Sequence, residues 1–239
     1  MTQNRSTSQR LQEDLARIID VTHSGDRLPS EPELARRLGV SRATLRESMR
    51  TFETQGLIRR RQGSGTFVIH PAQVMESGLE VLESIDTMAE RIGLSVSMGE
   101  LEIDHRLASL EETQALELAP ESHVVHLARV ILAEGRPAAY LIDIIPDDIL
   151  SPQDLREDFT GSALDLFIRR YPPSTLFSRC EINSVTATID VARKLGIQRG
   201  DVLLRFIAYL YTSSGRVLDY SFSYFLPGCF RFHVVRRVG

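Results

Sequence analysis

Two short helical patterns, separated by one glycine turn, constrain the fold of this chain more than any other feature. The first covers about residues 31–38, with Ser30 placed to cap it and Gly39 placed to end it. The second follows Ser41 and runs to Gly56, with apolar residues spaced by four and then three positions. Two helices joined so tightly are typical of a helix-turn-helix, in which the second helix enters the major groove of DNA.

The first of these helices follows another helical pattern, which covers residues 8–22 and has Ser8 as its expected N-cap. Glu33 stands three residues after Ser30, which is the spacing of a capping box, and Pro32 falls in the first turn. The sequence therefore predicts three helices in succession.

A glycine-containing hairpin is expected directly after the third helix. Residues 57–61 and 66–69 predict two short strands around a loop at 62–65. The loop lacks the lysine of a nucleotide-binding P-loop, and a strand rather than a helix follows its glycines. We therefore interpret it as the wing of a winged helix-turn-helix, with Arg59, Arg60 and Arg61 supplying positive charge for DNA phosphates.

Charge is divided unevenly along the chain. The protein carries a net charge of −4, but residues 1–70 hold 12 Arg against 8 Asp and Glu, and the remainder holds 16 Lys and Arg against 24 Asp and Glu. A basic N-terminal part on an acidic remainder predicts domains with different partners. We expect a DNA-binding domain over 1–70, a linker and leading helix over 71–92, and an effector-binding and dimerisation domain over 93–239.

The remainder of the chain mixes helical and strand patterns. Residues 73–91 predict a helix, and residues 123–146 predict two strands joined by a turn at Glu134 and Gly135. Further helices are expected over 162–170 and 187–195, a long hairpin over 202–225, and a last strand from Cys229. The fold class is therefore α+β, a winged helix-turn-helix followed by a mixed domain with a mostly antiparallel sheet.

The N-terminal part resembles the DNA-binding domain of the GntR family of bacterial transcription regulators. The likeness lies in L-P-S-E-x-E-L-A, in L-G-V-S-R-x-T-L-R and in the G-x-G-T-F-V wing. It implies DNA contacts by residues of the recognition helix and of the wing, which are Ser41, Arg42, Thr44, Arg46, Gln62 and Gly63. Arg50 and Arg60 add positive charge to the same two elements. Pro32 departs from the pattern, because many members have a DNA-contacting basic residue there.

The C-terminal part resembles the effector-binding (UTRA) domain of the HutC subfamily, which shares the chorismate-lyase fold. The likeness lies in H-L-A-R-V-I-L-A-E-G-R-P, in A-R-K-L-G-I-Q-R-G-D-V-L-L and in a final F-R-F. It implies a small-molecule effector held by Arg129, Tyr140, Ser162, Asp219 and Phe225. A buried arginine needs an anionic partner, so Arg129 faces either a protein carboxylate or an anionic ligand. Ser162 is either an ordinary N-cap or part of an anion site.

The resemblance also bears on the kind of effector. Members that bind phosphosugars tend to have a second arginine where this chain has Ile131, and acidic and tyrosyl residues near Tyr140 and Phe225. The loss of these residues predicts a smaller or less charged metabolite with one anionic group.

Several function classes find no support in the sequence. No metal-ligand spacing or hydrolase motif occurs, so no cofactor and no catalysis are expected, and Cys180 and Cys229 are interpreted as small core residues. A polar N-terminus and the absence of a long apolar run predict a cytoplasmic protein. We expect a homodimer that binds a pseudo-palindromic operator and acts as a repressor. A nucleoid protein without a specific operator and a lyase-like enzyme remain as alternatives.

Overall fold

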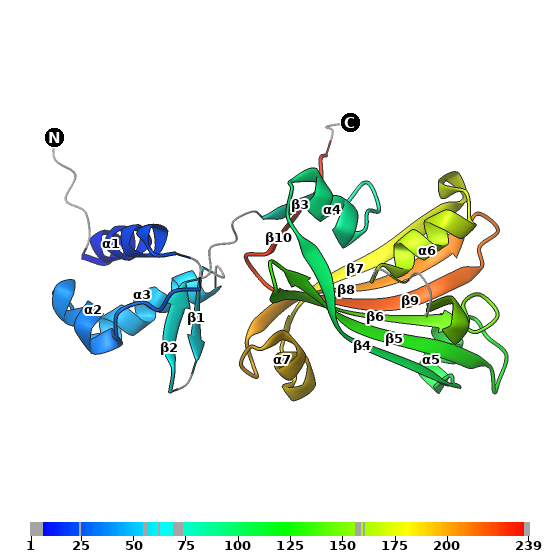
Figure 1. Ribbon diagram of the computed structural model, residues 1–239, viewed down its shortest axis with the longest axis horizontal. Helices are drawn as coiled ribbons and strands as arrows, with labels where there is room; N and C mark the ends of the chain where they lie inside the picture. The colour runs from blue at the N-terminus through cyan, green and yellow to red at the C-terminus, as the bar shows by residue number, and fades with distance from the viewer. Residues whose placement is uncertain are drawn as a thin grey trace. The chain divides into compact units, whose positions relative to one another are not determined.

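The protein divides into two compact units in a computed structural model (Figure 1). The structure describes residues 7–23, 25–54, 57–61, 63–68, 74–155, 159 and 161–236. The first unit is Met1–Val74 with Pro227–Cys229, and the second is Met75–Leu226 with Phe230–Gly239.

The first unit has the expected winged helix-turn-helix fold. Its elements are α1 (Thr7–Val21), α2 (Glu31–Arg37), α3 (Arg42–Thr54), β1 (Ile58–Arg61) and β2 (Gly65–Val68). The two strands pair antiparallel, with Ile58 opposite Val68 and Arg61 opposite Gly65. One apolar side of each helix packs into a shared core, formed by Leu11, Leu15, Ile19, Leu28, Leu34, Ala35, Leu45, Met49, Phe52, Ile58 and Val68.

One expected N-cap is wrong, and another has the expected position without the expected hydrogen bond. Ser8 lies inside α1, which begins at Thr7. Ser30 is the N-cap of α2, but its side chain accepts no capping hydrogen bond, so the expected capping box with Glu33 does not form. Pro32 occupies the first turn and has no amide hydrogen, which removes one of the two donors that a capping side chain can use.

Gly65 closes the hairpin in a backbone conformation with φ +112°, and a Cβ there would meet Arg27 Nε at 2.4 Å. Gly65→Ala is therefore expected to lower the free energy of unfolding of the first unit by about 1–3 kcal/mol. Gly63→Ala is the matched control, because its φ of +77° is nearer the left-handed region and a Cβ there meets nothing within 4 Å. Equal losses for the two variants in urea unfolding would contradict the argument.

The second unit is built on a six-stranded antiparallel sheet in the order β4-β5-β6-β9-β8-β7. The strands are β4 (Val96–Leu107), β5 (His123–Ala133), β6 (Arg136–Pro146), β7 (Leu176–Thr186), β8 (Val202–Thr212) and β9 (Val217–Phe225). The turn between β5 and β6 lies at Glu134 and Gly135, as expected, and both residues have positive φ. The α+β fold class is confirmed.

Helices cover both faces of this sheet (Figure 1). On one face lie α4 (Ile85–Arg91) and α6 (Ala163–Arg170), which pack against inward residues such as Ile131 and Leu127. On the other face α7 (Ile189–Leu195) packs against β6, and α5 (Leu110–Ala115) leads into a second apolar cluster around Val124 and Ile144. The alternation of side chains along each strand thus produces two separate cores.

The helix expected over 73–91 is wrong in its first half. Met75–Gly78 forms a strand, β3, and only Ile85–Arg91 is helical. The strand pairs in parallel with β10 (Phe230–His233), which comes from the far end of the chain. Backbone hydrogen bonds to a strand far away in the sequence have outweighed the local helical pattern. The spacing of apolar residues does not indicate which strand a segment will pair with.

The two edge strands, β4 and β7, were not anticipated. Both carry mostly polar, exposed side chains, as in the central segments of Val96–Leu107 and Leu176–Thr186. Edge strands expose one side of their backbone and bury little apolar surface, so they lack the apolar runs that indicated β5 and β6. Two 3-10 turns complete the unit, at Pro152–Leu155 and Pro173–Thr175. No helix in the described residues is long and apolar enough to cross a membrane.

Candidate nucleic-acid interface and ligand cavity

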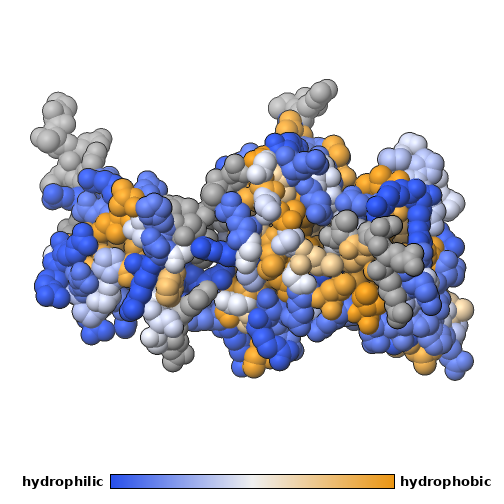
Figure 2. All heavy atoms as spheres, in the orientation of Figure 1, coloured by the Kyte–Doolittle hydropathy of each residue, from blue (hydrophilic) through white to orange (hydrophobic). Residues whose placement is uncertain are grey.

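The exposed side of α3 presents a row of polar side chains. Leu45 and Met49 are buried against the core, while the residues expected to contact DNA, namely Ser41, Arg42, Thr44, Arg46 and Arg50, are all exposed. Ser41 Oγ accepts a hydrogen bond from the Thr44 backbone amide at 3.1 Å, which fixes the start of the helix. The visible face of this unit is mostly hydrophilic (Figure 2). The geometry matches a helix that enters a DNA groove by its N-terminal turn.

The arginines of α3 differ in how they are held. Arg46 Nε donates to Glu31 Oε2 at 2.6 Å, which ties the third helix to the start of the second. Arg50 pairs with Glu47 at 3.2 Å on the same helix. Arg42 makes no ion pair within the described part of the chain, so its guanidinium is free to reach a base or a phosphate.

Arg60 turns toward its own domain. It lies on the wing face that carries Ile58, its side chain is 25% exposed, and it stands within ion-pair range of Glu53 and Glu31, at 3.7 and 3.9 Å. Its backbone amide also donates to Glu53, so the wing is fastened to α3. The structure therefore gives Arg60 a positioning role that the sequence did not reveal. Gly63 is exposed at the hairpin tip, and Gln62 lies outside the described residues.

A cavity of about 440 Å³ lies in the second unit, between the sheet, α4, α6 and the segment 79–84. Apolar side chains, among them Ile131, Leu141, Phe206 and Phe225, form much of its wall. On the visible face of this unit, apolar residues gather between α4 and α6 (Figure 2). A concave, largely apolar pocket with a few convergent polar groups is the usual form of a small-molecule site.

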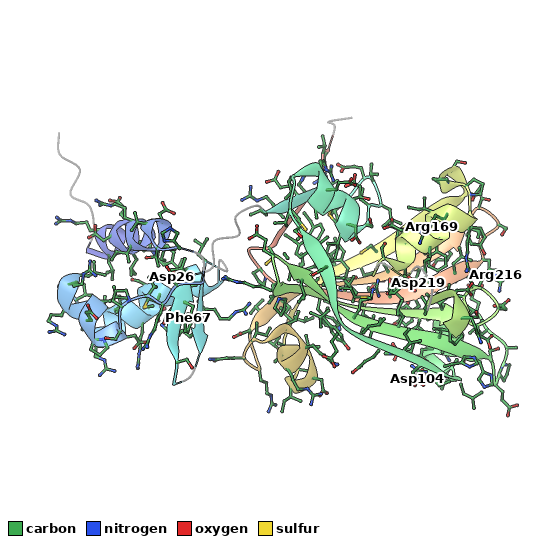
Figure 3. All side chains as sticks on the ribbon, viewed as in Figure 1. Asp26, Phe67, Asp104, Arg169, Arg216 and Asp219 are labelled. Atoms are coloured by element: carbon green, nitrogen blue, oxygen red, sulfur yellow. The ribbon has the colours of Figure 1, made fainter. Side chains whose placement is uncertain are left out.

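The polar groups of the cavity converge on Arg129. This residue is 3% exposed, its Nε donates to the Gly161 carbonyl, and its guanidinium forms a short ion pair with Asp143. Asp219 is also buried, on β9 within the sheet (Figure 3). Its Oδ1 has no hydrogen-bond partner in the part of the chain that the structure describes. One cation thus faces two carboxyl groups inside an apolar enclosure.

Comparison with known proteins identifies the family. The UTRA domain family matches residues 91–231, and the bacterial regulatory proteins of the gntR family match residues 5–68. The HTH-type transcriptional repressor NagR of Bacillus subtilis is 32% identical over 198 residues, which are 81% of this chain and 79% of that protein. The chain belongs to the GntR family, in the HutC subfamily that carries a UTRA domain.

Other relatives agree with this assignment. The histidine utilization repressor of Pseudomonas putida is 29% identical and covers 74% of this chain and 70% of its own. The crystal structure of PhnF from Mycobacterium smegmatis has a TM-score of 0.63 at 21% identity, over 96% of this chain and 100% of that one. GntR proteins are transcription regulators, which decides against the lyase-like alternative and against a nucleoid protein.

The cavity of the second unit, here called the UTRA cavity, is lined by four of the five residues expected to bind an effector. Arg129, Ser162, Asp219 and Phe225 all line it. Tyr140 does not, because it lies on the opposite face of β6 from Leu141 and stacks on Tyr224 with ring centroids 6.2 Å apart. Ser162 accepts a hydrogen bond from the Asp165 amide at 3.1 Å and is therefore an N-cap as well as a wall residue.

Asp143 is the cavity residue that the sequence analysis missed. It stands in the apolar strand segment L-I-D-I-I-P, where a lone carboxylate is unusual. That isolation was the signal available, since a buried acid needs a partner. Arg129 on the neighbouring strand is that partner, so the protein-carboxylate alternative for Arg129 is the one that the structure shows.

Burial raises the pKa of Asp219 well above its ordinary value, and the nearby Asp143 carboxylate raises it further, while Arg129 and Ser221 oppose the shift. Burial also raises the pKa of Asp86, whose neighbours include Asp165 and Arg129. The Asp219 carboxyl therefore holds its proton at a pH where an exposed aspartate has lost it.

Asp219→Asn is expected to stabilise the UTRA domain at neutral pH. Between the ordinary aspartate pKa, near 3.8, and the raised value in the folded state, the unfolded chain releases the Asp219 proton and the folded chain keeps it. Stability conferred by this group is complete below that window and falls by up to about 1.4 kcal/mol per pH unit within it. Urea unfolding from acid to neutral pH should show a flatter profile for Asp219→Asn. An unchanged slope would contradict the raised pKa of Asp219, whose charged neighbours are Asp143 and Arg129.

Proposed function

We propose that this protein is an effector-controlled repressor that binds a specific operator as a homodimer. The observation that carries the proposal is the exposed polar row on α3, set in a winged helix-turn-helix whose apolar side is fully used by the core. Two relatives, NagR and the histidine utilization repressor, are named as repressors. Their names support repression rather than activation. Such a protein works in the cytoplasm, where bacterial DNA lies.

In this proposal the DNA contacts come from Ser41, Arg42, Thr44, Arg46 and Arg50 on the recognition helix and from Gln62 and Gly63 on the wing. Arginine suits base readout because its guanidinium can pair with both O6 and N7 of guanine. Arg60 supports the wing and adds positive charge near phosphates. The DNA-binding domain covers residues 1–70, the linker and leading helix 71–92, and the effector-binding and dimerisation domain 93–239.

A homodimer follows from the limited reach of one recognition helix. One helix reads only a few base pairs, whereas two half-sites about one helical turn apart multiply the specificity. The operator is accordingly expected to be pseudo-palindromic. The effector occupies the UTRA cavity, contacted by Arg129, Ser162, Asp219 and Phe225, with Asp143 as an addition from the structure.

Selection of bound sequences from random DNA, followed by footprinting, tests this function. The expected result is one pseudo-palindromic site bound far more tightly than random DNA at the same salt concentration. Uniform, sequence-independent binding would overturn it. Coupling between two sites is reciprocal. Operator DNA must therefore weaken the binding of an inducing effector by the same factor by which the effector weakens operator binding.

A further inference from the structure

Most of the charged side chains in the cavity wall are acidic. Among the described lining residues the only cation is Arg129, and the carboxyl groups are Glu80, Glu83, Asp86, Asp143 and Asp219. Arg91, outside the lining, pairs with Glu83, and the remaining acids still outnumber the cations. A field of this sign concentrates cations in the cavity and opposes the entry of anions.

The one lining arginine is already committed. Its NH1 donates to Asp143 and its Nε donates to the Gly161 carbonyl. Its guanidinium carbon also lies 5.8 Å from the centre of the Phe159 ring. A ligand carboxylate or phosphate at Arg129 must compete with Asp143 for a cation that is already neutralised. The single anionic group expected from the sequence is therefore disfavoured by the folded cavity.

Asp219 supplies the opposite kind of contact. It is 6% exposed, it lines the cavity, and its Oδ1 finds no hydrogen-bond donor among the residues that the structure describes. A buried acceptor left without a donor is rare, and in a cavity wall a bound ligand can supply that donor. An alkylammonium group has three donors and no acceptor, and its charge matches an ionised carboxylate.

We propose that the effector is a small amine whose protonated nitrogen donates a hydrogen bond to Asp219, while its hydrocarbon or ring packs against Ile131, Leu141 and Phe225. The inference rests on the proposed function of the same cavity and names the effector's chemical class. On binding, the Asp219 carboxyl loses its proton to solvent and the ammonium takes that proton's place, so charge balances within the cavity. The volume of about 440 Å³ suits a compact metabolite.

Three probes of one shape test the proposal on the full chain: cyclohexylmethylamine, cyclohexylmethanol and cyclohexanecarboxylate, each at millimolar concentration. The amine is expected to raise the Tm of the UTRA domain and the carboxylate to leave it unchanged, with the alcohol between them. Asp219→Asn should abolish the shift caused by the amine. Asp190→Asn is the matched control, because it removes one acid from exposed α7 on the other face of the sheet and should leave the shift intact.

A second readout does not depend on a variant. Calorimetric titration of the wild-type chain with the amine, in two buffers of different ionisation enthalpy, should show release of a proton at neutral pH. Stabilisation by the carboxylate alone, an amine shift that survives Asp219→Asn, or no amine shift at all would each overturn the inference. A specific operator released only by an anionic compound would overturn it and leave the proposed function standing. If the protein has no specific operator, the proposed function is wrong. The Tm shift with the amine still tests the inference about the cavity in that case.

Discussion

Arg129→Met is expected to lower the free energy of unfolding of the UTRA domain by about 3–5 kcal/mol, the usual loss when one partner of a buried ion pair is removed. The variant leaves the buried carboxyl groups of Asp143 and Asp219 beside one another without a cation. The two carboxyl groups can escape this repulsion only by holding a proton, so the loss should shrink as the pH falls. Urea unfolding, followed by a probe in the second unit, measures it.

The double variant Arg129→Met with Asp143→Leu provides the control. Replacing both members of a buried pair by apolar residues of similar size removes the uncompensated charge and is often neutral. We therefore expect most of the lost stability to return. If the single variant costs less than about 1 kcal/mol, the range of an exposed pair, the guanidinium is not buried against Asp143 as described.

Arg46→Ala is expected to weaken operator binding by about 1–3 kcal/mol, or about 5- to 150-fold, and to relax the preference at the base pair that it contacts. The reason is that Arg46 lies in the first half of the recognition helix, exposed, and oriented by Glu31 at 2.6 Å. Binding to the operator and to random DNA should be measured at one salt concentration, because phosphate contacts depend strongly on salt.

Arg17→Ala is the comparison for this variant. Arg17 is an exposed arginine on α1, paired with Asp14, and it lies outside the predicted recognition surface. Its removal should change binding to every sequence slightly and equally. An Arg46→Ala protein that loses the same factor on operator and on random DNA would show that Arg46 contacts phosphate only, and the base-reading role would pass to Arg42.

Local signals were sufficient for the first unit and for parts of the second. The position of α3 was predicted from Ser41 and the four-residue spacing of its apolar side. The Glu134-Gly135 turn was predicted from its residues, because such turns need backbone conformations that few residues adopt. These features involve residues near one another in the chain, so their energetics can be read from a short window. The expected roles of the α3 residues in DNA binding stay predictions, although their exposure agrees with them.

The sequence by itself determined the winged helix and the α+β class, because turns and periodic apolar positions act over a few residues. Its motifs carried the resemblance to the family, which the family models match. The tertiary structure decided the rest. It joined β3 to β10 across the length of the chain, turned Tyr140 away from the cavity, and set Arg129 between Asp143 and the Gly161 carbonyl. Buried charge depends on which groups meet after folding, and strand pairing depends on backbone bonds that carry no side-chain signature.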